Sequence, residues 1–177
     1  MKKEKTAKTE KNEKHWERVT QEFAPVCDAD CRVLILGTAP SKKSREVGFY
    51  YGHPQNRFWK MLAAVTGERV PQSIEEKKAL LLRNHIALHD VIHSCDIIGS
   101  SDSSIKNVVP TDLKAIVKDS NVKRIFCNGK TSGTYFQKYQ QKELGIEAEV
   151  LPSTSPANAA YSVERLVEIW KEKIGEM

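Results

Sequence analysis

The sequence predicts an α/β protein with three layers, α/β/α, around a four-stranded, mainly parallel sheet. Two observations lead to this fold class. Short apolar runs that end in glycine or small polar residues recur along the chain, and segments with helical spacing of apolar residues separate them. Strands joined through helices pair in parallel and receive helices on both faces. Hydrophobic residues make up 40% of the 177 residues, so we expect a single α/β domain over residues 15–177.

The four predicted strands are the apolar runs at residues 32–37, 86–92, 122–127 and 146–151. Predicted helices cover residues 56–67, 73–83 and 163–174, and two more start at Pro110-Thr111 and at about Thr131. Two helix starts carry capping signals, because Ser73 is followed by Glu76 and Ser162 precedes the last amphipathic segment. Residues 94–110 are rich in Ser, Gly and Asp, and we expect them to form a long loop.

Composition excludes several classes of protein. The longest apolar runs have four or five residues, whereas a membrane-spanning helix needs about 20, so we expect no membrane span. No secretory leader pattern opens the sequence, and we therefore expect a cytoplasmic protein with reduced cysteines. The four cysteines match no common zinc or iron–sulfur spacing, so no metal site is predicted.

The positive charge of the chain is concentrated at its start. The net charge is +5, and residues 1–14 contain six Lys and three Glu. This segment has almost no side chain that could be buried, so we expect a disordered basic tail. Two interpretations stay open, a solubilising tail and an arm that binds a polyanion weakly.

Small and polar residues follow every predicted strand. They are residues 38–41, His89-Asp90, residues 128–132 and residues 152–158. Because the carboxyl ends of parallel strands meet at one edge of a sheet, these segments predict a ligand site there, although each alone could be an ordinary turn. The segment 129–132 is no phosphate-binding loop, because Arg124 stands where that motif requires glycine, and no dinucleotide-binding motif follows the first strand.

Two segments carry a resemblance to a known family. Residues 37–59, GTAPSKKSREVGFYYGHPQNRFW, resemble the first motif of the uracil-DNA glycosylase superfamily, and LPSTSPANAAYS at 151–162 resembles its second motif. The resemblance covers about residues 31–174 and implies the four-stranded fold predicted above. Ala39 and Ser153-Thr154-Ser155 stand where other branches carry catalytic Asn or Asp and His. Together, YYGHPQN and LPSTSPANA look like the hypoxanthine-DNA (deoxyinosine) glycosylase branch.

This resemblance implies that the protein removes hypoxanthine from DNA by base excision, without cofactor or metal. It implies a catalytic role for Asn56, although Asn56 could equally cap the helix that follows it. It also implies a DNA partner, and we expect a monomer that is associated with the nucleoid in a prokaryote. Removal of uracil or xanthine, a non-enzymatic nucleic-acid-binding relative and an unrelated small-molecule enzyme remain alternatives.

The residues expected to bind the base surround the first motif. A flipped base needs an aromatic face, which Tyr51 or Tyr50 could supply unless they are core residues. A carboxylate at Asp90 would accept a hydrogen bond from N1–H of hypoxanthine, or it could cap a loop. The predicted substrate-binding residues are Gly37, Thr38, Ala39, Pro40, Ser41, Tyr50, Tyr51, His53 and Asp90.

A second group of residues is expected to contact the DNA itself. Hydroxyl and amide side chains can donate to phosphates, and Pro156-Ala157 could enter the minor groove as a small wedge. The predicted DNA-binding residues are Ser44, Ser153, Thr154, Ser155, Pro156, Ala157 and Asn158.

Overall fold

A computed structural model describes residues 15–175. The tail at residues 1–14, predicted to be disordered, lies outside this range. The central strands are β2 (Val33–Gly37), β3 (Ile86–Asp90), β6 (Arg124–Asn128) and β7 (Ala148–Leu151). They are hydrogen-bonded in the order β3-β2-β6-β7, and all three pairings are parallel. The predicted four-stranded parallel sheet is therefore confirmed.

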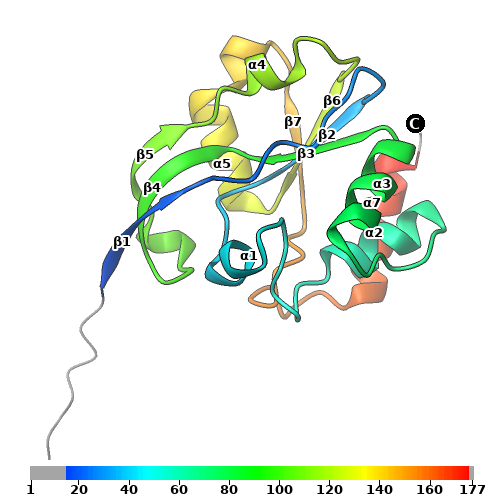
Figure 1. The fold of residues 1–177 in the computed structure, drawn as a ribbon, viewed down its shortest axis with the longest axis horizontal. Coiled ribbons are helices and arrows are strands. Elements are labelled where there is room, and N and C mark those ends of the chain that lie inside the picture. The colour runs from blue at the N-terminus through cyan, green and yellow to red at the C-terminus, as the bar shows by residue number, and fades with distance from the viewer. Residues whose placement is uncertain (1–14, 176–177) are drawn as a thin grey trace, which may run out of the picture.

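Helices cover both faces of this sheet (Figure 1). On one face lie α2 (Phe58–Thr66), α3 (Ile74–Arg83) and α7 (Val163–Ile174). On the other lie α4 (Leu113–Val117) and α5 (Lys130–Tyr139). Successive side chains of β2 alternate between the two cores, since Val33 and Ile35 pack on the first face and Leu34 and Leu36 on the second. The predicted three layers are confirmed.

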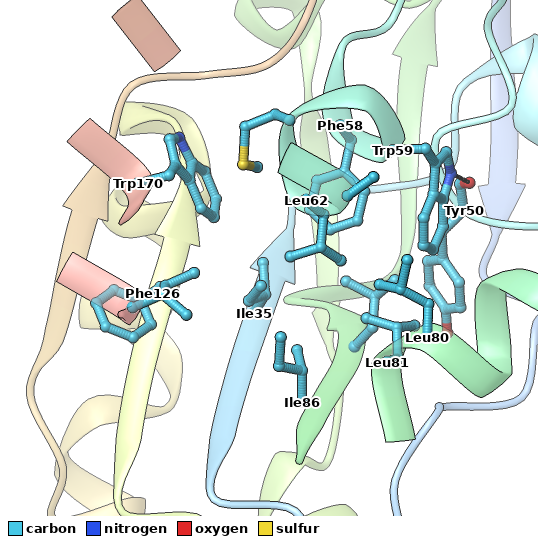
Figure 2. Packing of buried hydrophobic residues seen from close by; sticks show 14 of the residues in the cluster. Ile35, Tyr50, Phe58, Trp59, Leu62, Leu80, Leu81, Ile86, Phe126 and Trp170 are labelled. Atoms are coloured by element: carbon cyan, nitrogen blue, oxygen red, sulfur yellow. Dashed lines mark hydrogen bonds between the residues drawn. The ribbon is translucent and has the colours of Figure 1, made fainter. Parts of the chain in front are cut away.

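The first core is rich in aromatic side chains, and these fix the loops at the sheet edge (Figure 2). Trp170 of α7 is fully buried, and its indole Nε1 donates to the Pro152 carbonyl at 3.0 Å. Trp59 of α2 donates in the same way to the Tyr50 carbonyl at 3.1 Å. Packing of α2 and α7 thus holds both segments that resemble family motifs.

A second, antiparallel sheet was not predicted. It contains β1 (Trp16–Thr20), β4 (Ile92–Ile98) and β5 (Lys106–Pro110), in the order β1-β4-β5. The prediction of a loop over residues 94–110 was wrong, and the predicted strand 86–92 is divided between β3 and β4. One face of an antiparallel sheet can be exposed to solvent, and its strands then carry polar residues at alternate positions. Residues 94–110 therefore had a composition similar to that of a loop.

Both predicted capping signals are confirmed. Ser73 accepts a hydrogen bond from the Glu76 amide and Ser162 from the Arg165 amide, both at 3.1 Å. The helix predicted to start at Pro110-Thr111 is α4, and it begins later, at Leu113, because Pro110 belongs to β5. Asp112 caps it by accepting a hydrogen bond from the Ala115 amide.

Short elements complete the described chain. They are α1 (Lys42–Val47), the 3-10 turn Asp102–Ser104 and α6 (Gln141–Leu144). None of the helices within residues 15–175 combines the length and the apolarity that a bilayer crossing requires.

Candidate functional site

A pocket of about 170 Å³ lies at the carboxyl ends of the parallel strands. It is built from the loops after β2 and β7, the segment between α1 and α2, the last residues of β3 and β6, and the connection from β4 to β5. The predicted residues that line it are Gly37, Thr38, Ala39, Pro40, Ser41, Ser44, Tyr50, Tyr51, Asn56, Asp90, Ser153, Thr154 and Ser155. Asn128, from the segment 128–132 that was predicted to border the site, also lines the pocket. The lining residues that were not predicted are Phe23, Ile97, Gly99, Ser100 and Asp102. This is the sheet edge at which ligands of such folds bind.

Four predicted residues lie outside the pocket lining. The His53 ring accepts a hydrogen bond from the Gln55 amide at 3.1 Å, which stabilises its own turn. Asn158 donates to the Ser153 carbonyl at 3.0 Å, so its side chain holds the loop after β7. Pro156 and Ala157 are exposed at the tip of that loop.

Asn56 is held by two hydrogen bonds to its side-chain oxygen. Oδ1 accepts from the Phe58 amide at 3.0 Å, at the start of α2, and from the Thr154 hydroxyl at 2.9 Å. A backbone N–H can only donate, so Nδ2 is the remaining polar atom of the amide. Within residues 15–175, Nδ2 has no hydrogen-bond partner. The side chain therefore supports the helix start and also supplies a free N–H donor at the pocket.

Thr154 and Ser44 are buried, which corrects their predicted contact with DNA. Asn128 makes two hydrogen bonds to Thr154, both at 3.0 Å. Asn128 Oδ1 accepts from the backbone amide of Thr154, and Asn128 Nδ2 donates to the Thr154 hydroxyl. The Thr154 hydroxyl is thereby directed to Asn56. Ser44 is 3% exposed, and its hydroxyl oxygen accepts from the Gly52 amide at 3.0 Å. Both side chains stabilise the pocket and are inaccessible to phosphates.

The two tyrosines have different environments. Tyr51 packs one ring face on Phe58, with ring centroids 4.0 Å apart, so only its other face can receive a base. Tyr51 has a φ of 53°, a conformation that a bulky residue rarely adopts, and its hydroxyl is buried without a partner in the described chain. Tyr50 is 2% exposed, and its hydroxyl donates to the Ala24 carbonyl at 3.0 Å and contacts His89 Nδ1 at 2.5 Å. Tyr50 is a core residue that borders the pocket, and its ring packs in the core.

Asp90 is a buried carboxyl group at the end of β3. Burial raises its pKa to about 7, and a hydrogen bond from Gln21 Nε2 to Oδ2 opposes this rise. The second oxygen, Oδ1, lies against Gly37, where a Cβ atom would collide with it and lie 2.9 Å from the Tyr51 hydroxyl. The strand therefore needs glycine at position 37 for the carboxyl group to reach the pocket.

The pKa of Asp90 predicts how its burial affects stability. Between its ordinary value of 3.8 and about 7 the folded protein binds more protons than the unfolded chain, so stability falls as pH rises through this range. We expect Asp90→Asn to raise the melting temperature at pH 8 and to raise it less at pH 4.5, as measured by thermal unfolding. Asp96→Asn is the control, because a hydrogen bond from Asn107 lowers the pKa of Asp96 below its ordinary value of 3.8. This carboxylate is therefore ionised at both pH values, and its replacement should change the melting temperature by nearly the same amount at each. An equal gain from Asp90→Asn at both pH values would contradict this account.

Arg57 ties the two motif segments together and was not predicted. Its backbone amide donates to the Thr154 carbonyl at 3.1 Å. Its guanidinium donates to carbonyl oxygens of the segment after β7, those of Thr154 (3.3 Å), Ser155 (2.7 Å), Asn158 (3.0 Å) and Tyr161. Five donors in a planar fork suit such a role, which a lysine could not reproduce. The sequence signal was an arginine inside an otherwise apolar helix start.

The described residues contain no group of three or more His, Cys, Asp or Glu side chains arranged to hold a metal ion. All four cysteines are free thiols. The pocket instead offers hydrogen-bond donors, the carboxyl groups of Asp90 and Asp102, and an aromatic face. These groups suit recognition of a planar, polar ligand by hydrogen bonding and stacking.

Comparisons with known proteins agree on one family. A model of the uracil DNA glycosylase superfamily matches residues 24–173. A curated relative from Methanosarcina barkeri, named hypoxanthine DNA glycosylase, is 39% identical over 78% of this chain and 87% of its own length. One from Methanosarcina acetivorans with the same name is 35% identical over 81% of this chain and 90% of its own. The solution NMR structure of a candidate uracil DNA glycosylase from Methanosarcina acetivorans superimposes with a TM-score of 0.72 at 35% identity, over 86% of this chain and 94% of that one.

Proposed function

The chain belongs to the uracil DNA glycosylase superfamily, and we propose that this DNA glycosylase removes hypoxanthine from deoxyinosine in DNA. One observation carries the proposal. A single pocket at the sheet edge combines a carboxyl group, Asp90, with a free amide donor, Asn56 Nδ2. The name hypoxanthine DNA glycosylase, which both relatives carry, supports the same substrate.

The pocket suits a base that has left the helix. A glycosylase cannot reach the C1′–N9 bond of a stacked nucleotide, so the deoxyinosine must rotate out of the duplex first. The Tyr51 face opposite Phe58 then stacks on the purine. Stacking on Phe58 holds the Tyr51 ring in place before the base arrives, and it helps to maintain the rarely adopted backbone conformation of Tyr51.

Asp90 distinguishes hypoxanthine from adenine in this proposal. Hypoxanthine carries a proton on N1 beside its C6 carbonyl, whereas N1 of adenine carries a lone pair. Ionised Asp90 accepts a hydrogen bond from N1–H and repels the adenine lone pair. Because Asp90 is buried, an unpaired contact there costs binding energy, which makes the discrimination strong.

Asn56 acts on the leaving base in this proposal. When the C1′–N9 bond breaks, its electron pair moves onto the purine, a water oxygen bonds to C1′, and a water proton replaces the lost sugar bond on the base. A donor at Nδ2 stabilises the developing negative charge more strongly than the ground state. Asn56 takes no proton, since both lone pairs of Oδ1 already accept hydrogen bonds. No lysine among the described residues lines the pocket, so we expect water to attack and the strand to stay intact.

The loop after β7 is the proposed contact with the DNA backbone. Ser153 and Ser155 line the pocket mouth, and exposed Pro156 and Ala157 extend beyond it. Arg57 holds the carbonyls of this loop, which lowers the entropy lost when the loop enters the minor groove. The small side chain of Ala157 favours mispaired or single-stranded substrates, because it fills little of the space left by a flipped base. We infer a cytoplasmic monomer that works on nucleoid DNA.

Deletion of residues 1–14 is expected to weaken DNA binding modestly and to flatten its dependence on salt. Six lysines lie in this segment, and phosphate contacts carry the salt-dependent part of affinity. The single-turnover rate at saturating protein should not change. The measurement is the slope of log affinity against log salt for both proteins. An identical slope would show that the tail makes no contact with DNA.

Uracil is the second candidate substrate. The structural neighbour is described as a candidate uracil DNA glycosylase, and uracil, like hypoxanthine, presents an N–H next to a carbonyl group. A relative without enzymatic activity is the third interpretation, because Ala39 and the segment Ser153-Thr154-Ser155 stand where the resemblance places the catalytic side chains of other branches.

A substrate panel separates these interpretations. Oligonucleotides with one inosine, uracil or xanthine are incubated with excess protein in a chelator, and alkali then cleaves any abasic site. We expect inosine to react fastest, with no effect of the chelator. A higher rate for uracil than for inosine would make uracil the preferred substrate and hypoxanthine the second one. No reaction with any base would show that the chain only binds DNA.

A further inference from the structure

We propose that Gln21 is a positioning residue that determines which hydrogen-bonding group Asp90 presents to the base. This inference rests on the proposed function, since it concerns how the same pocket reads hypoxanthine. Gln21 precedes residues 24–173, which match the family model. It follows β1, the edge strand of the second sheet.

Gln21 is fixed in orientation by its neighbours. Its side chain is 6% exposed, and Oε1 accepts from the Phe23 amide at 2.6 Å. Because that amide can only donate, the side-chain oxygen of Gln21 must face Phe23, and Nε2 must face Asp90. The backbone amide of Gln21 donates to the His93 carbonyl at 2.7 Å, which continues the pairing of β1 with β4. The second sheet thus brings one amide donor to the end of β3.

This donor assigns the two oxygens of Asp90 to different roles. Gln21 Nε2 donates to Oδ2, so Oδ2 is already occupied. Oδ1 lies against Gly37, and Gly37 lines the pocket. Oδ1 is therefore the atom that meets the base, and it accepts a hydrogen bond when Asp90 is ionised.

The other titratable groups around Asp90 do not replace Gln21. Burial and the charge of Asp90 raise the pKa of the Tyr50 and Tyr51 phenols, so both stay neutral. Burial lowers the pKa of His89 to about 4, so this ring is also neutral at pH 7. Asp102, a second carboxyl group of the pocket lining, adds no positive charge. The Gln21 amide is thus the group that stabilises ionised Asp90 against the effect of burial.

Exchange of the amide and the acid tests this assignment. In Asp90→Asn, Gln21 still donates to an oxygen at position 90, so the new amide presents its NH₂ group to the base and opposes N1–H. We expect the single-turnover rate of hypoxanthine release to fall about 100-fold or more. In the double variant Gln21→Glu with Asp90→Asn, the new carboxylate accepts from the Phe23 amide and from the new NH₂ group. An amide oxygen then faces the base again, and we expect the rate to recover about tenfold or more from that of Asp90→Asn.

A pH profile gives a second readout. Gln21→Met removes the donor but keeps a side chain of similar length, so the pKa of Asp90 rises further. We expect the alkaline rise in kcat/KM of hypoxanthine release to shift to higher pH by about one unit. Gln140→Met is the matched control, because Gln140 is a 3% exposed glutamine whose Nε2 donates to the Val91 and Thr111 carbonyls and not to Asp90. Its profile should keep the wild-type inflection.

The outcomes distinguish this inference from the proposed function. A wild-type protein that releases no hypoxanthine would overturn the proposed function. An active wild type, together with a folded double variant no faster than Asp90→Asn, would overturn the role of Gln21 alone. If melting curves show that the double variant does not fold, the Gln21→Met profile decides, and an unshifted inflection overturns the inference.

Discussion

Asn56→Asp is expected to lower the single-turnover rate of hypoxanthine release by about two orders of magnitude or more while the protein remains folded. The aspartate oxygens can still accept from the Phe58 amide and the Thr154 hydroxyl, so both structural hydrogen bonds remain. The substitution removes only the Nδ2 donor and adds a negative charge that suits a helix start. Loss of one preorganised donor raises the activation barrier by about 3 kcal/mol.

A purely structural role of Asn56 makes a different forecast. Asn56→Ala would then cost about 1 kcal/mol of stability, and Asn56→Asp or Asn56→Ser would restore both stability and activity. Melting temperature and excision rate are measured on the same preparations. A folded Asn56→Asp protein that releases hypoxanthine at the wild-type rate would remove Asn56 from the chemistry.

Gly37→Ala is expected to abolish most hypoxanthine release with a smaller effect on the fold. A Cβ atom at position 37 would collide with Asp90 Oδ1 and approach the Tyr51 hydroxyl to 2.9 Å. The carboxyl group must then move away from the base, and the Tyr51 ring must shift. We expect the rate of hypoxanthine release to fall by about 100-fold or more. We also expect overpacking to lower the free energy of unfolding by about 1–3 kcal/mol.

Gly133→Ala is the matched control, because the Cβ atom that it adds would also collide with a neighbouring side chain. Gly133 lies on α5, and its added Cβ would collide with Val150 of β7. Neither residue lines the pocket. Val150 is 49% exposed and can adjust. We expect this variant to excise normally. Equal losses of rate in Gly37→Ala and Gly133→Ala would show that general destabilisation, and not the displacement of Asp90, lowers activity.

The sequence contains most of the information on the parallel sheet. The run VLILG at Val33–Gly37 is buried at every position because helices cover both faces, and this uninterrupted run distinguishes the strand. The helix starts at Ser73 and Ser162 are local features, so they too could be predicted. Strand β1 has only five residues, which is too short for a clear alternation of apolar and polar side chains. It pairs with β4, about 80 positions away, so no local signal could predict it.

The candidate site shows the same division between local and distant determinants. Gly37, Asn56 and Asp90 could be predicted because they end strands or lie in a motif. The burial of Thr154 could not, because it depends on Asn128 at the end of another strand. Gln21 and Arg57 were missed for this reason as well, since each acts through hydrogen bonds to residues 69 to 104 positions away.

The most direct test of the account is identification of the products from a duplex with one deoxyinosine. Excess protein is incubated with the duplex in a chelator, and free bases and strands are analysed by mass spectrometry before and after alkali. The account predicts one equivalent of free hypoxanthine, an intact abasic strand before alkali, and a strand break only afterwards. Unreacted deoxyinosine at protein excess, or a strand already broken before alkali, would contradict hydrolytic removal of hypoxanthine by this pocket.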